Sequence, residues 1–180
     1  IYIYPEQSLE VEAQFAMINK LFSPSFFNEL RSNQQLGYSV FSLDYEIHDY
    51  PAIGMTIVSD NTDLQNLKEK MMEFQYGFAA ALESVDNKTI KNVKTALLED
   101  INQKPENIYL EVSPLISDWE DGNYNFDTEK AFANYIENTS RQDLINLNNK
   151  FIVDGEFMNV TIQIRGKDFR DAPYFSWENF

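Results

Sequence analysis

The 180-residue sequence contains no cysteine and only one histidine, His48. The lack of cysteine excludes disulfide bonds, thiolate metal sites and cysteine nucleophiles. A zinc hydrolase site usually needs two or three nitrogen ligands, which a single histidine cannot supply. His48 stands between two strand-like runs, where an exposed turn is expected. The sequence therefore predicts that this chain carries neither a catalytic histidine nor a metal site of its own.

Basic residues and glycine are also scarce. The chain has 14 Lys and Arg against 29 Asp and Glu, which gives a net charge of −15. Such a surface repels phosphate backbones and anionic lipids, so neither nucleic acid nor a membrane is expected as a partner. The longest apolar runs, such as residues 78–82, are far shorter than the roughly 20 residues that cross a bilayer. The 6 glycines form no phosphate-binding loop.

Apolar residues, by contrast, are plentiful: 43% of the chain is hydrophobic and 14% is aromatic. This composition excludes a disordered chain and supports one folded core. The length, and the lack of a linker or repeat, predict that residues 1–180 form a single domain. Because strand-like alternation begins at Ile1, with no methionine before it, we expect the chain to be a piece of a longer protein or a processed product.

Apolar residues recur at helical spacing along most of the chain. Ser8 is the expected N-cap of the first helix, and a second helix is expected to begin at Pro24, because proline is preferred in the first turn. Pro114 predicts a kink or a break. The expected helices cover residues 8–22, 24–36, 63–84, 90–103, 106–121, 128–136 and 140–149.

Alternating residues predict strands at 1–4, 38–47, 51–59 and 158–165, with 38–47 and 51–59 paired as an antiparallel hairpin. The fold class is therefore α+β, a small antiparallel sheet with helices packed on one face. The other face is expected to stay wet and to line a cavity. We assign to that polar face Ser42, Asp44, Thr161 and Gln163.

Two motifs carry a family resemblance. Residues 26–40 read FFNELRSNQQLGYSV, and residues 122–127 read GNYNFD. They resemble the FF-x-x-LR-x-x-x-QLGY-x-V and GN-x-x-FD stretches of the insulinase/pitrilysin family of zinc metallopeptidases, the inverzincins. The order of elements also fits, so the resemblance covers nearly the whole chain. Among members of the family, bacterial pitrilysin is the one that the motifs most resemble.

The resemblance implies the last of four homologous domains, of the processing-peptidase type, which pack as two halves around a closed chamber. The family's zinc ligands, an H-x-x-E-H helix and a distal glutamate, belong to an N-terminal domain. By this reading, residues 1–180 are a non-zinc-binding C-terminal domain. No catalytic residue and no metal ligand is assigned to this chain, and zinc is the cofactor of the longer protein.

The resemblance also assigns substrate binding to Arg31 and Tyr38, which reach across the chamber to the peptide. A guanidinium and a phenol are suitable donors for a peptide carbonyl that becomes an oxyanion. Without the resemblance, Arg31 reads as a surface helix arginine and Tyr38 as a half-buried strand tyrosine. The nearby Phe26 and Phe27, with Phe126 of the second motif, read as core residues.

The leading functional hypothesis is therefore the substrate-contacting C-terminal domain of a zinc metalloendopeptidase, inactive alone. Two alternatives stay open: a structural or partner subunit of the same fold without peptidase activity, and a peptide-binding module. The implied partners are the N-terminal domains of the same chain and peptide substrates. The resemblance suggests the bacterial periplasm, with the cytoplasm as the alternative. Cleavage preference and oligomeric state do not follow from the sequence.

Overall fold

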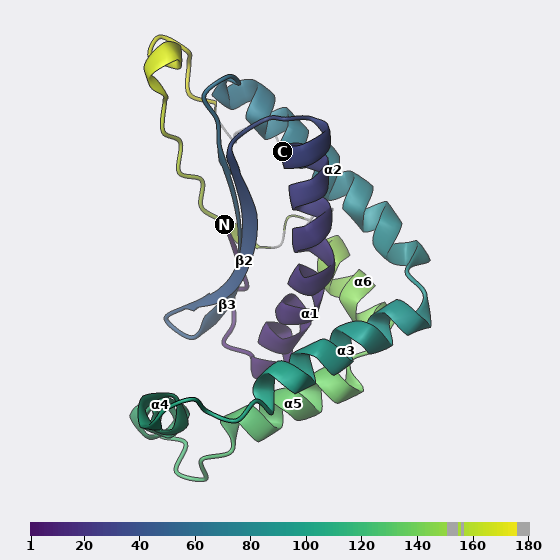
Figure 1. Ribbon diagram of the computed structural model, residues 1–180, viewed down its shortest axis with the longest axis vertical. Coiled ribbons are helices and arrows are strands. Elements are labelled where there is room, and N and C mark those ends of the chain that lie inside the picture. Colours follow the sequence, from purple (N-terminus) through teal and green to yellow (C-terminus); the bar gives the residue numbers. More distant parts are fainter. Residues whose placement is uncertain (151–154, 156, 176–180) are drawn as a thin grey trace.

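The computed structural model describes residues 1–150, 155 and 157–175. These residues form six α-helices and a four-stranded antiparallel sheet, so the α+β class is confirmed (Figure 1). In chain order the elements are β1 (Tyr2–Ile3), α1 (Leu9–Phe26), the π-helix η1 (Phe27–Asn33), β2 (Ser39–Ile47), β3 (Tyr50–Val58), α2 (Leu64–Ser84), α3 (Asn87–Ile101), α4 (Ile108–Glu120), α5 (Thr128–Asn138), α6 (Arg141–Asn149), β4 (Met158–Asn159) and the 3-10 turn η3 (Lys167–Phe169).

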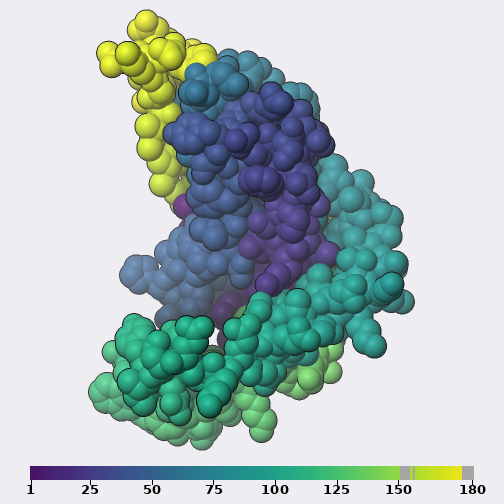
Figure 2. Space-filling view, viewed as in Figure 1, coloured from purple at the N-terminus to yellow at the C-terminus, as the bar shows by residue number. Residues whose placement is uncertain are grey.

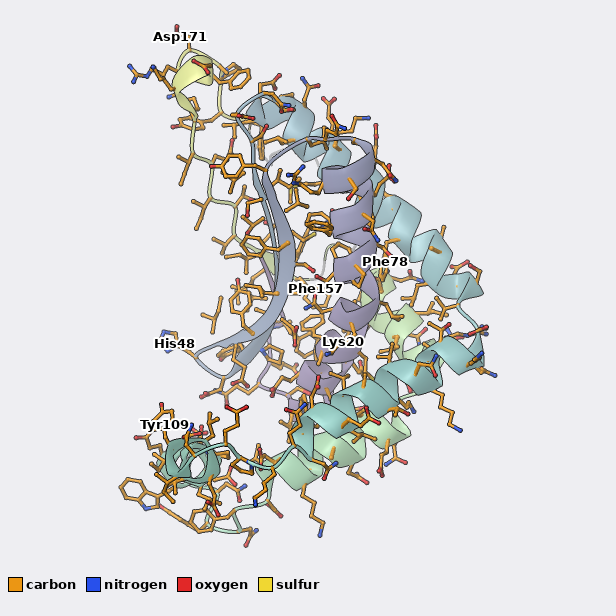
Figure 3. All side chains as sticks on the ribbon, viewed as in Figure 1. Lys20, His48, Phe78, Tyr109, Phe157 and Asp171 are labelled. Atoms are coloured by element: carbon orange, nitrogen blue, oxygen red, sulfur yellow. The ribbon has the colours of Figure 1, made fainter. Side chains whose placement is uncertain are left out.

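The sheet has the strand order β2-β3-β1-β4. The expected hairpin is confirmed, with Ser39 opposite Val58 and Ile47 opposite Tyr50. Its turn is formed by His48 and Asp49, with φ angles of 51° and 65°. Two consecutive positive φ angles are typical of the tight turns that suit the twist of a hairpin. His48 is exposed there and projects from the turn, as the sequence predicted (Figure 3).

The two faces of β2 are used in the opposite way to the expectation. Val40 and Ser42 are buried on the face that packs against α1, whereas Phe41 and Leu43 are exposed on the other face. Ser42 donates a 2.6 Å hydrogen bond to the side-chain oxygen of Asn19 on α1. The predicted wet face is therefore wrong for Ser42, because a polar helix residue satisfies its hydroxyl inside the core.

Helix α1 is the centre of the core. It lies between the sheet and helices α3, α5 and α6, and it buries residues on nearly every side (Figure 1). The helix start predicted at Pro24 is wrong, since α1 continues through it to Phe26. Phe22 and Phe26 are both buried, and their rings stack with centroids 5.3 Å apart. Burial of apolar side chains on both sides of Pro24 offsets its cost in the helix.

Five of the six described α-helices, all except α5, begin at a residue whose side chain caps the helix. The side chains of Ser8, Asp63, Asp86, Asn107 and Ser140 each accept a backbone N–H of the first turn of the helix that follows. Helix α4 runs unbroken through Pro114. The helix itself was therefore predicted correctly, but the break expected at Pro114 does not occur.

The last predicted strand is much shorter than expected. Only Met158–Asn159 pairs in the sheet, with Tyr2 and Ile3. Beyond it, Ile162 and Ile164 are 73% and 79% exposed, so the expected half-buried strand through residue 164 is wrong. The chain then turns back at η3, and residues 176–180 lie outside the described residues.

Candidate functional site

The passage from α1 to β2 carries the first motif. Helix α1 continues without a break into η1, in which the N–H of Gln34 bonds to the carbonyl of Glu29, five residues earlier, at 2.9 Å. A π-helix is rare and is found frequently at functional sites. Phe26 and Leu30 are fully buried on one side of this turn. Arg31 follows Leu30 directly and is therefore at the rim of the core, where it is partly exposed.

The end of η1 is fixed by one carboxylate. The side-chain amides of Asn33 and Gln34 donate hydrogen bonds of 2.8 Å and 2.9 Å to the two oxygens of Glu29. The amides of Gln34 and Asn33 lower the pKa of Glu29, because they stabilise its charged form. The sequence analysis missed these three residues. A carboxylate followed by amides four and five positions later is the signal that could have found them.

After η1 the chain reverses in a tight turn. Gln35 has a φ of 54°, and the N–H of Leu36 bonds to the carbonyl of Leu30 at 2.9 Å. Gly37 is buried against the end of β3, where an added Cβ atom would lie 2.4 Å from the carbonyl oxygen of Val58. Only glycine permits this approach. The N–H of Tyr38 then bonds to the same oxygen at 3.0 Å, which aligns the start of β2 with β3.

Arg31 and Tyr38 are thus positioned by elements that meet at one end of the sheet, because η1 packs against β2. Tyr38 continues the alternation of Val40 and Ser42, so it belongs to the helix-covered side of the sheet. At the strand's beginning, however, its side chain is 64% exposed. Within the part of the chain that the structure describes, neither side chain forms a hydrogen bond or an ion pair. Both can therefore donate to an incoming acceptor.

The second motif has a structural role. Asn123 donates to the side-chain oxygens of Asp127 and Thr128 at 3.1 Å and 2.9 Å, and its N–H bonds to the carbonyl of Asp118 at 2.7 Å. The buried carboxylate of Asp118 accepts the N–H of Thr128 at 3.3 Å. This loop fastens α4 to α5 at the end of the molecule opposite to η1 (Figure 1). The two motifs do not form one site.

The expected core role of the motif phenylalanines is only partly correct. Phe26 is fully buried, but Phe27 and Phe126 are exposed. Helix α4 is also unusually exposed for an apolar helix. Its exposed members include Ile108, Tyr109, Leu115, Ile116 and Trp119, and Figure 3 labels Tyr109 on this helix.

No group of three or more His, Asp or Glu side chains that could hold a metal ion occurs among the described residues. Nor is any helix in these parts of the chain both long and apolar enough to cross a membrane.

Comparison with known proteins gives a consistent result. The sequence model of the family described as "PQQ synthase PqqF-like, C-terminal lobe domain 4" matches residues 17–115, a range that includes Arg31 and Tyr38. Protease 3 of Salmonella typhi is 25% identical over 162 residues, which are 90% of this chain and 17% of that protein. Protease 3 of Escherichia coli K12 is 25% identical over 173 residues, or 93% of this chain and 18% of that protein.

More distant proteins share the same region. The A-factor-processing enzyme of Saccharomyces cerevisiae is 24% identical over 92% of this chain and 16% of its own length. The crystal structure of pitrilysin superposes with a TM-score of 0.76 at 21% identity, over 83% of this chain and 16% of that one. The fold is therefore that of a pitrilysin domain. The chain spans only 16–18% of the length of these three curated relatives.

Proposed function

Because this chain belongs to the PqqF-like family of C-terminal lobe domains, we propose that it is the substrate-contacting, non-zinc domain of a longer zinc metalloendopeptidase. One observation carries the proposal. Arg31 and Tyr38, the two residues matched to the family's first motif, come from a π-helix and a strand start that pack together, and both keep their donors free among the described residues.

The chemistry of the two side chains suits peptide hydrolysis. When water attacks a peptide carbonyl, its oxygen becomes an oxyanion, and donors already aimed at that position lower the barrier. Arg31 supplies a permanent positive charge with several N–H donors, and Tyr38 supplies one phenolic O–H. Zinc, held by an N-terminal domain according to the resemblance, would supply a Lewis acid and an activated water.

The fixed backbone around these residues supports the same role. Glu29, Asn33 and Gln34 tie the end of η1 together, and Gly37 brings the chain onto the end of β3. Such support limits how far Arg31 and Tyr38 can move, and donors must be held close to their productive positions to act.

The longer protein is part of the proposal. We propose that residues 1–180 form its C-terminal domain, that N-terminal domains of the same chain enclose peptide substrates with it, and that this domain alone is inactive. Similarity to the bacterial proteases favours a periplasmic location. Cell fractionation of the source organism, with the protein detected by antibody, would test the location separately.

The decisive experiment uses the full-length protein. Its zinc content and its cleavage of a panel of unstructured peptides should be measured with and without a chelator. We expect stoichiometric zinc and chelator-sensitive cleavage, whereas the separate 180-residue chain should cleave nothing. Zinc-free, inactive full-length protein would instead favour the structural or partner subunit. Chelator-sensitive cleavage by the 180-residue chain alone would overturn the proposal.

A further inference from the structure

The chain's own C-terminal segment is held by side chains from the polar side of residues 161–165. Arg165 donates to the carbonyl oxygens of Arg170 and Ala172 at 2.7 Å and 3.0 Å, and its guanidinium lies 4.0 Å from the ring centroid of Tyr174. Figure 2 shows the segment (yellow) on the surface, at the end of the molecule farthest from α4. Arg165 thus binds a returning stretch of the peptide chain.

Gln163 recognises the main chain of a single residue at the end of this segment. Its side-chain nitrogen donates to the carbonyl oxygen of Phe175 at 2.9 Å, and its side-chain oxygen accepts the N–H of Phe175 at 3.0 Å. A primary amide offers one acceptor and two donors, so it can pair with both backbone groups of one residue, as a neighbouring strand would. This pairing is independent of the side chain that the paired residue carries.

The ring of Phe175 is recognised separately. It lines a cavity of about 200 Å³ between β3, α2 and residues 159–162. The apolar walls include Ile57, Leu67, Met71 and Ile162. The ammonium of Lys68 lies 5.0 Å from the centroid of the ring, within the range of a cation–π interaction. Methionine side chains adapt their shape readily, so a wall that contains Met55, Met71 and Met72 suits more than one large side chain.

Phe175 does not belong to the main core. The buried cluster is formed by residues of the helices, β2 and β3, with Phe157, and neither Tyr174 nor Phe175 is part of it. Phe175 is only partly buried, and open volume remains beside its ring. The described contacts of the segment include polar contacts to its backbone and one aromatic ring, which another peptide of similar chemistry could make.

We propose that this cavity, together with the adjoining place of the Phe175 ring, is a binding subsite for one aromatic residue of an extended peptide, and that Phe175 fills part of it as a tethered stand-in. Gln163 holds the backbone of the bound residue, while Lys68 and the apolar walls hold its ring. The site is distinct from Arg31 and Tyr38. The identity of the natural occupant as a peptide substrate rests on the proposed function. The ability of the cavity to bind an aromatic residue is independent of that function.

The test uses N-acetyl-phenylalaninamide, which carries the ring, the N–H and the carbonyl of one residue. Saturation-transfer NMR measures its binding to the full-length protein with the substitution Phe175→Ala. If the tethered ring fills its place about 90% of the time, only about a tenth of the wild-type protein is free to bind the probe, so removing the ring should strengthen binding about tenfold. N-acetyl-alaninamide, which lacks the ring, should bind much more weakly to the same variant.

Two further variants distinguish binding in the subsite from binding that follows only because the C-terminal segment has detached. Tyr174→Ala removes the neighbouring ring, which is stacked on Arg165 outside the cavity, but leaves Phe175 in place, so it should strengthen probe binding much less than Phe175→Ala does. Adding Gln163→Ala to Phe175→Ala should remove most of the gained binding. The proposal is overturned if folded Phe175→Ala does not bind the probe better than wild type, or if Gln163→Ala has no effect on that binding.

A second measurement covers the case in which Phe175→Ala does not fold. Gln163→Leu in the otherwise wild-type protein should speed hydrogen exchange of residues 170–175, measured by mass spectrometry, because it removes both hydrogen bonds to the backbone of Phe175. Unchanged exchange would overturn the inferred role of Gln163. None of these measurements needs turnover, so they report on the cavity even if the full-length protein cleaves no peptide.

Discussion

The N–H of Tyr38 and the carbonyl oxygen of Val58 are joined by a 3.0 Å hydrogen bond, directly after a glycine at which an added Cβ atom would lie 2.4 Å from the same oxygen. This bond ties the candidate substrate-binding tyrosine to the end of β3. Its backbone position is therefore set by the sheet, while its side chain remains exposed. The proposed site can for that reason be tested with side-chain changes that leave the fold intact.

Tyr38→Phe in the full-length protein is expected to lower kcat about 10²- to 10³-fold, the usual loss when one oxyanion donor is removed. The exposed side chain should leave the free energy of unfolding within about 0.5 kcal/mol of wild type. Steady-state kinetics on a short peptide and thermal unfolding measure the two effects. Tyr109→Phe on α4 is the matched control, since that side chain is also exposed and lies at the other end of the molecule. A folded Tyr38→Phe protein with wild-type kcat/KM would reduce Tyr38 to a surface residue.

Arg31→Ala is expected to raise KM and to lower kcat, because an arginine can hold the carbonyl both before and during attack. Arg31→Lys keeps the charge but loses the planar fork of donors, so it should recover only part of the loss. Zinc content should stay at the wild-type level in both variants, because the resemblance places no ligand in this domain. If neither kinetic parameter changes in Arg31→Ala, the arginine does not contact the substrate.

Two glycine substitutions should have opposite effects on stability. Gly37→Ala places a methyl group 2.4 Å from a backbone oxygen and should destabilise the domain by about 1–3 kcal/mol. Gly77→Ala, inside α2, meets no atom within 4 Å and should stabilise it by about 0.5–1 kcal/mol. Chemical denaturation of both variants checks the pair. If Gly37→Ala leaves the free energy of unfolding unchanged, the close approach to Val58 does not fix the start of β2.

Glu12 should make stability depend on pH. The pKa of its carboxyl is raised from 4.5 to about 8. Burial is the largest cause, and Glu46 and Asp44 on the facing strand β2 contribute the rest. Between these values the folded state binds more protons than the unfolded state, so stability falls as the pH rises. Glu12→Gln should therefore raise Tm most above pH 8 and least near pH 4.5.

The control for Glu12 is Glu106→Gln, which removes an exposed charge from the same acidic chain. Its effect on Tm should be small at every pH, as is usual for substitutions of surface residues. If the difference between Glu12→Gln and wild type is constant from pH 4.5 to 8.5, the contact between α1 and β2 does not hold a proton.

The sequence predicted those parts of the fold that local chemistry decides. Ser8, Asp63 and Ser140 begin helices because their side chains satisfy free N–H groups, and His48 lies in a turn between two alternating strands. Tertiary contacts decided the rest. The stacking of Phe22 on Phe26 stabilises α1 on both sides of Pro24, so the helix continues. The hydrogen bond between Ser42 and Asn19 allows the polar side of β2 to be buried against α1.

The candidate site was predicted only as residue types. A spacing of four between Phe26 and Leu30 is typical of an α-helix, so nothing in the pattern indicated the π-helix that directs Arg31. The two hydrogen bonds between Gln163 and Phe175 could not be predicted either. The distance between these residues depends on the turn of the backbone between them, which the residue pattern does not specify. Both features belong to the path of the backbone rather than to the pattern of the residues.

The π-helix has a genetic consequence. Its turn contains one residue more than an α-helical turn, so the loss of a single codon within residues 27–29 would restore ordinary α-helical spacing. Arg31 would then stand four residues after Phe26, the spacing that Leu30 now holds in the core. The helix would have to rotate by about 100° to keep the guanidinium in water. A one-codon deletion could thus preserve the reading frame and most of the fold while redirecting the arginine.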